Sequence, residues 1–358
     1  MKTLTETADV IQLTQEICDI ESVSGSEREL ADAVERWARA TPHLTVFRDG
    51  DALVARTELG RAHRVIIAGH LDTVPVNNNL PVDVRGEGAD RVLWGRGTVD
   101  MKGGVAVMVR LMRDLVAPAH DVTWVFYDHE EVAASLNGLG RLARVNPELL
   151  AADFAILGEP TNAIIEGGCN GTLRVRITTT GVRAHSARAW MGVNAIHGAA
   201  DVLARLAAYE PRTITVDGLD YREGLNAVSI HGGIAGNVIP DECAIEVNFR
   251  FAPSRTESEA LAHVAEVFAG YELEVTDSSA GARPGADSPL AQDFIRSVGG
   301  DIAPKYGWTD VARFTALGIP AVNYGPGNPS LAHADNEHVP VSDLVACEAG
   351  LRSWLGGA

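Results

Sequence analysis

Acidic and imidazole side chains follow several short apolar segments of this sequence. The candidates are His70 and Asp72 after residues 65–69, Glu130 and Glu131 after 124–127, Glu159 after 154–158, Asp100 after a glycine-rich stretch, and His333 far downstream. If the apolar segments are strands of an open α/β sheet, the crevice beyond their carboxyl ends is where ligands bind. Imidazole and carboxylate groups gathered in one crevice suit zinc and related divalent metals. The pattern therefore predicts a metal-dependent hydrolase.

The first of these groups also have ordinary structural explanations. Side chains two residues apart on a strand lie on the same side, so Asp72 can accept the second ring N–H of His70 and fix its tautomer. Such a pair is also common as a purely structural contact. Asp100 directly precedes a helical segment, where a carboxylate is a favourable N-cap. The Gly-x-Gly before Asp100 lacks the other residues of a phosphate-binding loop, so we reject a nucleotide site.

The remaining groups are informative only in combination. Glu130 and Glu131 at a strand end point in different directions, so one could bind metal while the other faces a substrate pocket. Taken alone, the pair fits a solvated acidic turn, because Glu is usually exposed. Glu159 and His333 could equally belong to surface loops. Convergence of all these side chains in one crevice favours the chemical interpretation.

Two kinds of pattern divide the chain. From residue 65 to 159, short apolar segments alternate with helical ones, which favours a mostly parallel sheet covered by helices. In residues 101–115 the apolar side chains share one helical face. Nearer the start, Ser26 and Glu29 have the spacing of a capping box, which predicts the beginning of a helix.

The pattern changes after Gly171, where apolar and polar residues alternate as in a strand buried on one face. The following segments read as a βαββαβ order, with strands near 173–177, 227–234, 244–251 and 272–277 and helices over 193–206 and 257–268. This order suggests a small α+β domain inserted into the larger one. We expect residues 1–172 and 282–358 to form the larger domain and residues 173–281 the inserted one.

Composition bounds the class of protein. The 358 residues are 46% hydrophobic and 22% charged, which is typical of a globular chain long enough for two domains. The net charge of -18 argues against non-specific nucleic-acid binding, which needs clustered Lys and Arg. The sequence lacks a long apolar run and a signal-like start, so we expect a cytoplasmic enzyme without membrane contact. Its scattered cysteines lack a Cys-x-x-Cys pair and should be reduced and packed in apolar surroundings.

As an ordered set, these motifs resemble those of the dizinc aminoacylase and carboxypeptidase family. The motifs are residues 69–75 (Gly-His-Leu-Asp-Thr-Val-Pro), 95–104 (Gly-Arg-Gly-Thr-Val-Asp-Met-Lys-Gly-Gly), 130–131, 158–161 (Gly-Glu-Pro-Thr) and the late His333. The resemblance spans nearly the whole chain. It implies a zinc-peptidase-like catalytic domain, with a mixed, mostly parallel sheet covered by helices, and an inserted α+β ferredoxin-like domain that acts as lid and dimerisation domain.

The resemblance also implies roles for single residues. It assigns two zinc ions per subunit to these ligands: His70 and Glu159 for one ion, Glu131 and His333 for the other, with Asp100 bridging. Asp72 would orient His70. Glu130 would be the general base, taking a proton from a metal-bridging water and passing it to the leaving amine. Cobalt or manganese could replace zinc, because metal selection depends on geometry and availability.

Three residues of the inserted domain match positions that act on substrate in the family. His185 would reach the neighbouring subunit's site in a homodimer, although a His packed within the lid is the alternative. Asn237 and Arg250 match positions that grip the substrate. The guanidinium of Arg250 suits a terminal carboxylate, but a structural salt bridge within its strand would also account for it.

Within the family, residues 168–175, 236–241 and 307–314 are similar to the succinyl-diaminopimelate desuccinylases of actinobacterial type. This implies hydrolysis of N-succinyl-LL-2,6-diaminopimelate, a small-molecule substrate, in lysine and diaminopimelate biosynthesis. Some segments depart from the desuccinylase pattern, among them Gly236-Asn237, so other reactions stay open. The alternatives are deacylation of another N-acyl amino acid such as N-acetylornithine, cleavage of a dipeptide, or a non-catalytic metal-stabilised binding protein. The retained Glu130 argues against the last, because only catalysis needs a base beside the metal ligands.

Overall fold

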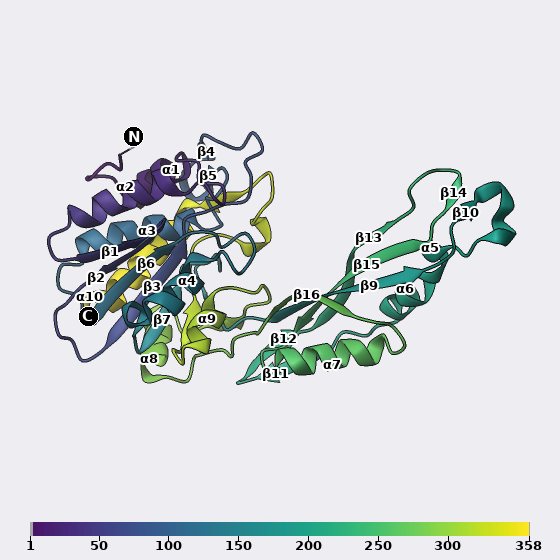
Figure 1. Cartoon of the computed structure of the whole chain (residues 1–358). Coiled ribbons are helices and arrows are strands. Elements are labelled where there is room, and N and C mark those ends of the chain that lie inside the picture. Colours follow the sequence, from purple (N-terminus) through teal and green to yellow (C-terminus); the bar gives the residue numbers. More distant parts are fainter. Residues whose placement is uncertain (1–2, 358) are drawn as a thin grey trace. The chain divides into compact units, whose positions relative to one another are not determined.

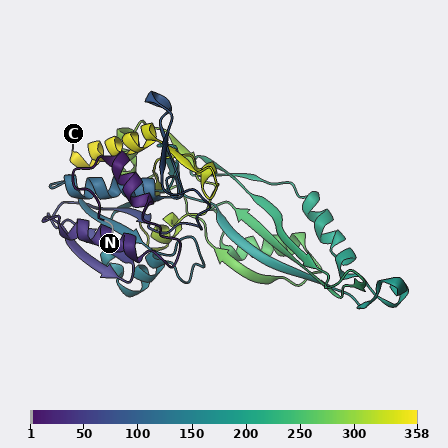
Figure 2. The same ribbon diagram turned by 90° about the horizontal axis from the view of Figure 1, so that it is seen from above.

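The computed structural model describes residues 3–357, which fold into two compact units (Figure 1). Unit 1 contains the residues up to Gly167, Pro284–Ala303 and those from Thr309 onward. Unit 2 contains Gly168–Arg283 and Pro304–Trp308. Both chain ends therefore belong to unit 1, as the turned view in Figure 2 also shows.

Unit 1 is built on a mixed sheet with the strand order β1-β2-β6-β3-β7-β18-β8-β17. Its strands are β1 (Thr45–Asp49), β2 (Ala52–Arg56), β3 (Arg64–His70), β6 (Asp121–Tyr127), β7 (Phe154–Leu157), β8 (Ile165–Gly167), β17 (Ile302–Pro304) and β18 (Ala321–Asn323). The neighbours β6, β3, β7 and β18 are parallel, whereas β1, β2 and β8 pair antiparallel. A smaller sheet joins β4 (Asp83–Arg85), β5 (Val92–Trp94) and β19 (His338–Pro340).

Helices cover this sheet. Those of unit 1 are α1 (Val10–Cys18), α2 (Arg28–Arg39), α3 (Lys102–Asp114), α4 (Gly138–Val145), α8 (Pro289–Ser297), α9 (Val311–Ala316) and α10 (Val341–Gly356), with 3-10 turns η1 (Gly88–Asp90), η2 (Pro147–Leu150) and η4 (Pro329–Leu331). α3 packs against β3 and β6 and is itself contacted by α1, α2 and α10. One apolar core of α1, α2, α3, α8 and α10 with the sheet buries Trp124, Phe126 and Phe154 almost fully. The predicted α/β fold with a mostly parallel sheet is confirmed.

The parallel strands explain why the predicted site residues converge. β3 ends at His70, β6 ends at Tyr127 just before the two Glu residues, and β7 ends at Leu157 just before Glu159. β3 lies between β6 and β7 and is parallel to both, so the three carboxyl ends open at the same edge. This edge is where an open α/β sheet binds ligands.

Unit 2 is an antiparallel sheet with the order β13-β15-β9-β16 and helices on one face. Its elements are β9 (Gly171–Thr180), β10 (Ala184–His185), η3 (Ser186–Met191), α5 (Ala195–Gly198), α6 (Ala200–Ala207), β11 (Thr213–Val216), β12 (Leu219–Arg222), β13 (Gly224–Gly232), β14 (Val238–Ile239), β15 (Glu242–Phe251), α7 (Glu257–Val267) and β16 (Glu274–Ser279). Alternate apolar residues of β9 and β15 pack on α5, α6 and α7, and their polar neighbours face the other side. The predicted βαββαβ order is present, and its sheet order is that of a ferredoxin-like domain.

One local prediction is wrong. α2 begins at Arg28 with Glu27 as N-cap, and no side chain caps it, so Ser26 and Glu29 do not form a capping box. Instead the buried carboxylate of Glu27 accepts hydrogen bonds from the backbone N–H groups of Gly25 and His129. A tertiary contact thus replaces the local cap that the spacing suggested.

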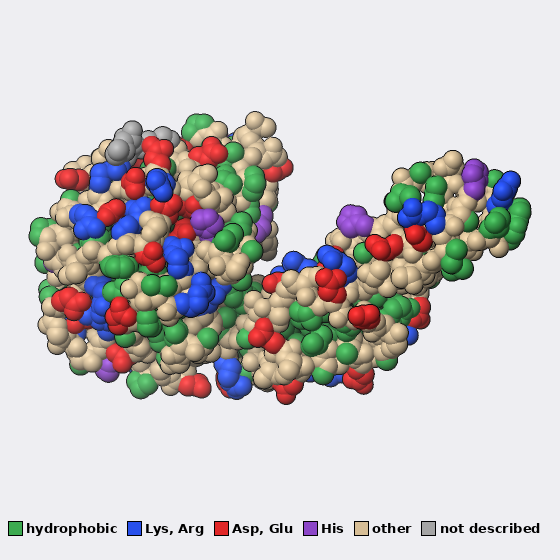
Figure 3. All heavy atoms as spheres, viewed as in Figure 1, with side chains coloured by type: hydrophobic (Ala, Val, Ile, Leu, Met, Phe, Trp, Pro, Cys, Tyr) green, Lys and Arg blue, Asp and Glu red, His purple; other side chains and the backbone are tan. Residues whose placement is uncertain are grey.

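The cysteines and the surface agree with the composition. Cys18, Cys169, Cys243 and Cys347 are buried thiols that form no disulfide with one another, as predicted. Acidic and basic side chains are interspersed over the face shown in Figure 3. Every helix within residues 3–357 is too short or too polar to span a membrane.

Gly104 of α3 packs directly against the backbone at the end of β7. A Cβ added at Gly104 would lie 2.2 Å from the carbonyl oxygen of Gly158, a backbone atom that cannot rotate away. We expect Gly104→Ala to destabilise unit 1 by about 1–3 kcal/mol, because this overlap outweighs the roughly 1 kcal/mol that Ala contributes in a helix. Urea unfolding measures the change. At Gly307 the added Cβ meets nothing within 4 Å, so Gly307→Ala is the control, and equal stability of the two variants would contradict the packing argument.

Candidate metal centre

The carboxylate of Asp100 lies between two imidazoles in unit 1. Its Oδ1 is 3.2 Å from Nε2 of His70, and its Oδ2 is 3.4 Å from Nε2 of His333. His70 is buried at the end of β3, whereas the side chain of His333 is 53% exposed on a loop. Each oxygen of one carboxylate thus faces a different imidazole, which is the arrangement that a bridging ligand requires.

A second carboxylate stands beside each imidazole. Glu159 Oε1 is 3.9 Å from Nε2 of His70, and Glu131 Oε1 is 3.0 Å from Nε2 of His333. One ligand atom each of His70, Asp100 and Glu131 also lies within 4.8 Å of the other two. The structure therefore brings together all the residues that the sequence predicted as metal ligands.

These separations fit divalent ions. Two ligand atoms bound to one tetrahedral ion, each about 2 Å from it, lie about 3.3 Å apart. The imidazole-to-Asp100 distances of 3.2 and 3.4 Å and the His333-to-Glu131 distance of 3.0 Å are close to that value. Nitrogen and carboxylate oxygen are also the donors that zinc and related metals accept. The cluster can hold one ion on each side of Asp100.

Asp72 fixes the parts of the centre to one another. The closest acceptor for Nδ1 of His70 is the backbone oxygen of Asp72 at 3.0 Å, with its carboxylate Oδ1 at 3.6 Å. The carboxylate itself accepts the backbone N–H groups of both Glu130 and Glu131 at 3.0 Å and the hydroxyl of Ser24 at 2.6 Å. Asp72 therefore orients His70 mainly through its backbone and holds the Glu pair through its side chain.

The Glu pair stands in a turn beyond the strand end. β6 ends at Tyr127, and His129 adopts a left-handed backbone conformation with φ of 58° before the pair begins. The turn, rather than the alternation of a strand, sends Glu131 toward His333 while Glu130 lies outside the three-residue group. The two carboxylates are thus separated, but for a different reason from the predicted one.

Electrostatics follow from burial and pairing. Burial alone would raise the pKa of Asp72, but the nearby imidazole of His70 and hydrogen bonds from Ser24 and the Glu130 backbone lower it to about 2. Burial likewise opposes ionisation of Asp100, yet hydrogen bonds from His333 and His70 hold its pKa well below the usual range. Hydrogen bonds to Asp100 and Glu131 raise the pKa of His333 to about 10. Without metal, the protonated imidazole of His333 offsets part of the negative charge of Asp100 and Glu131.

Glu130 differs from the neighbouring Asp72 and Asp100 because its pKa is raised rather than lowered. Burial raises its pKa well above the usual value, His70 partly offsets this effect, and the carboxylates of Asp310, Glu159 and Glu131 raise it further. A carboxylate with a raised pKa takes up a proton more readily near neutral pH and can later return it. This suits a proton carrier beside the ligands better than a metal ligand.

The remaining predicted residues lie in unit 2. His185 is exposed on β10, which pairs with β14, and the carbonyl of Asn237 accepts the backbone N–H of Ser186 at 2.9 Å, so His185 and Asn237 are neighbours. Arg250 is half-buried near the end of β15, opposite Thr172. Burial and the nearby Arg174 lower the pKa of Arg250. Among the described residues it has no carboxylate within ion-pair distance, so the structural salt bridge is not present.

Sequence reasoning missed three residues that support the centre. Ser24 donates to Asp72, and Arg96 and Glu337 form a buried ion pair behind Asp100 and the His333 loop. Glu337 stands four residues after His333, and Arg96 four residues before Asp100. This proximity in sequence was the only available signal, because their partners lie far away along the chain.

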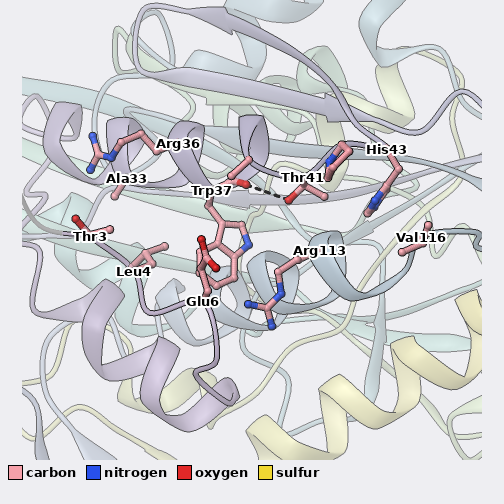
Figure 4. A pocket seen from close by; sticks show the side chains of 12 residues that line it. Thr3, Leu4, Glu6, Ala33, Arg36, Trp37, Thr41, His43, Arg113 and Val116 are labelled. Atoms are coloured by element: carbon pink, nitrogen blue, oxygen red, sulfur yellow. Dashed lines mark hydrogen bonds between the residues drawn. The ribbon is translucent and has the colours of Figure 1, made fainter.

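A separate cavity of 380 Å³ lies elsewhere in unit 1, beside α2 and the end of α3 (Figure 4). Its lining includes Trp37, His43 and Arg113 but none of the predicted site residues. Trp37 Nε1 already donates to the carbonyl of Val109, and a ring nitrogen of His43 lies 3.1 Å from the carbonyl oxygen of Met112. The cavity holds none of the residues gathered around Asp100, so it is separate from the candidate metal centre.

Comparison with known proteins identifies the family. The family model described as Peptidase family M20/M25/M40 matches residues 66–355. The chain belongs to this family. It is 52% identical over 352 residues to the DapE protein of Mycobacterium tuberculosis, covering 98% of both chains. It is 46% identical over 358 residues to the succinyl-diaminopimelate desuccinylase of Corynebacterium glutamicum, covering 97% of this chain and 96% of that one.

Solved structures show the same fold. A tripeptidase from Staphylococcus aureus has a TM-score of 0.79 at 22% identity, covering 97% of both chains. The M20 family metallo-carboxypeptidase Sso-CP2 from Sulfolobus solfataricus has a TM-score of 0.77 at 16% identity, covering 98% of this chain and 99% of that one. Family membership makes the chain a hydrolase. Together with the geometry of the cluster, it identifies a site for divalent metal ions.

The raised pKa of His333 predicts proton release on metal binding. Because this pKa rises from 6.5 to about 10, the metal-free protein keeps the His333 proton at pH 8, and a metal can bind the imidazole only after that proton leaves. We expect release of about one proton per charged imidazole at pH 8 and weaker metal binding as the pH falls. Calorimetric titration in buffers of different ionisation enthalpy counts the protons. A count near zero at pH 8 would show that His333 is already neutral.

Proposed function

We propose that this protein is a succinyl-diaminopimelate desuccinylase. It would be a cytoplasmic dizinc amidohydrolase that converts N-succinyl-LL-2,6-diaminopimelate to succinate and LL-2,6-diaminopimelate in lysine and diaminopimelate biosynthesis. The observation that carries the chemistry is the position of Asp100 between His70 and His333, with a further carboxylate beside each imidazole. The substrate is proposed from the name of the Corynebacterium glutamicum relative, which is 46% identical over nearly the full length.

The ligand set supports zinc at both positions. His70 and Glu159 would hold one ion, Glu131 and His333 the other, and Asp100 would bridge them. Two nitrogen donors among carboxylates favour zinc over magnesium or calcium, which prefer oxygen alone. When bound, such ions polarise the scissile carbonyl and bring the pKa of a water toward neutrality. A structurally similar Bacillus subtilis protein is described as a dinuclear metal-binding peptidase, at a TM-score of 0.68 and 16% identity.

The protein's own residues would move the proton. Glu130 would accept it from the attacking water and deliver it to the leaving amine nitrogen, which must be protonated as the C–N bond breaks. Its raised pKa supports both steps, since the carboxylate must hold the proton between them. Asp72 would keep Glu130 in place through the backbone N–H of that residue.

Arg250 would bind a carboxylate of the substrate. Its guanidinium is half-buried, has another arginine nearby and lacks a carboxylate partner among residues 3–357. A cation in such surroundings gains from an incoming anion, and a guanidinium can bind a carboxylate through two parallel hydrogen bonds. Diaminopimelate substrates carry several carboxylates, so this residue fits the proposed substrate class.

The geometry of unit 2 supports a homodimer in which the site is shared. β15 runs from Glu242, near β10 and β14, to Arg250 at the other end. Eight residues of strand span about 26 Å. His185 and Asn237 therefore lie too far from Arg250 to contact one small substrate from the same chain. We propose that residues 173–281 act as lid and dimerisation domain and bring His185 and Asn237 to the partner's site.

Exposed apolar residues of unit 2 also favour an association of two copies. β13 is an edge strand, and its Val228 and Ile230 are 57% and 45% exposed. Near β10, Trp190 and Met191 are 79% and 61% exposed. Natural proteins usually protect long edge strands and large apolar patches, so contact with a second subunit would explain both.

A rate comparison tests the substrate and the base together. On zinc-loaded protein we expect much faster hydrolysis of N-succinyl-LL-diaminopimelate than of N-acetylornithine. Glu130→Ala should lower turnover on the order of 10²–10⁴-fold while the zinc content stays near wild type, because Glu130 is not a ligand. Preference for acetylornithine would keep the metal mechanism and move the enzyme to another deacylation. Equal loss of zinc in Glu130→Ala would overturn the division of roles between the two Glu residues.

Mixing two inactive variants tests whether His185 acts on the partner's site. Glu130→Ala and His185→Ala should each be nearly inactive alone. If His185 acts across the dimer, each mixed dimer has one site with both residues intact, and subunit exchange should restore about a quarter of wild-type activity. If His185 acts within its own chain, neither site of a mixed dimer is intact and no activity returns. Giving the two variants different affinity tags and recovering dimers that carry both tags controls for exchange.

A further inference from the structure

Arg96 and Glu337 form a buried ion pair that the chemistry described above does not use. Arg96 is 3% exposed and Glu337 is fully buried, and Nη1 of the guanidinium is 2.8 Å from Oε2 of the carboxylate. Arg96 lies in the loop that leads to Asp100, and Glu337 follows the His333 loop and directly precedes β19. The pair therefore joins two loops that each carry a metal ligand.

Glu337 is attached to the backbone of Asp100. Its second oxygen, Oε1, accepts the backbone N–H of Val99 at 2.9 Å and that of Asp100 at 3.1 Å. The backbone oxygen of Glu337 also accepts the N–H of Gly95 at 3.0 Å. The position of the Asp100 backbone thus depends on a carboxylate that stands 237 residues further along the chain.

Arg96 is attached to the backbone of the His333 loop. Its guanidinium donates to the carbonyl oxygens of His333 at 3.4 Å and Ala334 at 3.3 Å, and its Nε donates to that of Pro75 at 3.2 Å. His333 itself has a left-handed backbone with φ of 65° and a half-exposed side chain. The half-exposed imidazole is held at its ring by Glu131 and Asp100, and the contacts from Arg96 hold the backbone of its loop.

The other metal position is held differently. His70 is the last residue of β3, and Glu159 follows β7 by two residues, so the hydrogen bonds of the central parallel strands fix both. The hydrogen bonds of Arg96 and Glu337 run instead to the backbone of the loops that carry Asp100, His333 and Pro75. Glu337 also supports the backbone of Asp100, which both metal positions share, so loss of the ion pair should weaken both. The His333 side should be weakened more, because only there is a second ligand loop released.

We propose that Arg96 and Glu337 are positioning residues that set the distance between Asp100 and His333, and that they determine the affinity of the ion on the His333 side. This rests on the proposed dizinc function. Loss of either partner leaves the other as an unpaired buried charge and frees the loop that it held. Contacts behind a ligand typically change metal affinity by about 10–100-fold, which sets the scale of the expected effect.

Glu337→Gln tests the proposal. The amide keeps the shape of the side chain but cannot accept from Arg96 and from both backbone N–H groups at once. Metal-free protein titrated with Zn²⁺ in a calorimeter should bind two ions in the wild type. In the variant one ion should bind about 10–100-fold more weakly, and the loss of affinity for the other ion should be clearly smaller. Titration with Co²⁺ should show the same loss in the visible absorption of one of the two equivalents.

Glu223→Gln is the matched control. Glu223 is also buried, pairs with Arg255 at 2.7 Å and accepts the backbone N–H of Ala252 at 3.1 Å, but it lies in unit 2 with no predicted metal ligand. It should lose a comparable amount of stability and keep both ions. Unchanged binding of two ions in folded Glu337→Gln, or equal weakening of both ions, would overturn the proposal. A wild type that binds no second ion would instead overturn the dizinc function.

Arg96→Lys keeps the test decisive if Glu337→Gln does not fold. Lysine preserves the charge beside Glu337 but cannot reach the carbonyls of His333, Ala334 and Pro75 with one ammonium group. We expect the same unequal weakening of the two ions in this variant. Its absence in a folded protein would show that Arg96 has only a structural role.

Discussion

The negative charge gathered at one edge of the unit 1 sheet determines how the candidate metal centre is built. Five carboxylates gather there: Asp72, Asp100, Glu130, Glu131 and Glu159. Their mutual repulsion is strong where water is scarce, so they must be balanced by hydrogen-bond donors, protons or metal ions. The pKa values of His70 and His333 are raised, so protons on these imidazoles balance part of the negative charge. Divalent ions would replace those protons, which couples metal binding to pH.

The carboxylates differ in what balances their negative charge. Some receive hydrogen bonds from within the protein, and others face the space where ligands would bind. Asp72 receives the Ser24 hydroxyl and two backbone N–H groups, so its charge is used to build the turn that carries Glu130 and Glu131. Within residues 3–357 no such donor reaches the side chain of Glu130, and burial raises the pKa of its carboxyl group. Asp100 is left facing both imidazoles. In the proposed mechanism the same chemical group would thus serve as scaffold, proton carrier or bridging ligand according to its surroundings.

What the sequence could predict follows from which contacts are local. Apolar segments followed by His70 and Glu159 were sufficient to predict convergence, because parallel strands must end at a common edge. The turn at Glu130 and Glu131 was misread as a strand end, since neither Asp72 as its acceptor nor the backbone conformation of His129 is visible in the spacing. The capping box failed for a similar reason.

Contacts between distant loops were beyond prediction altogether. Glu337 and Arg96 are 241 residues apart, and no periodicity links them. Their pairing depends on how the small β4-β5-β19 sheet brings β5 next to β19. The family resemblance supplied the metal ligands, because these follow short motifs. It did not supply the residues behind them, which are defined only by the folded chain.

The two halves of the centre therefore differ in physical origin. His70 lies on a buried strand whose backbone is paired on both sides, and its position is determined by the core of unit 1. His333 lies on an exposed loop and depends on a buried ion pair and a few long hydrogen bonds. Elements with fewer packing contacts open at lower free-energy cost than core strands. The half centred on His70 would thus be preorganised before an ion arrives, whereas the half centred on His333 would gain order from a bound ion. Under the proposed dizinc function, the two positions would then fill stepwise.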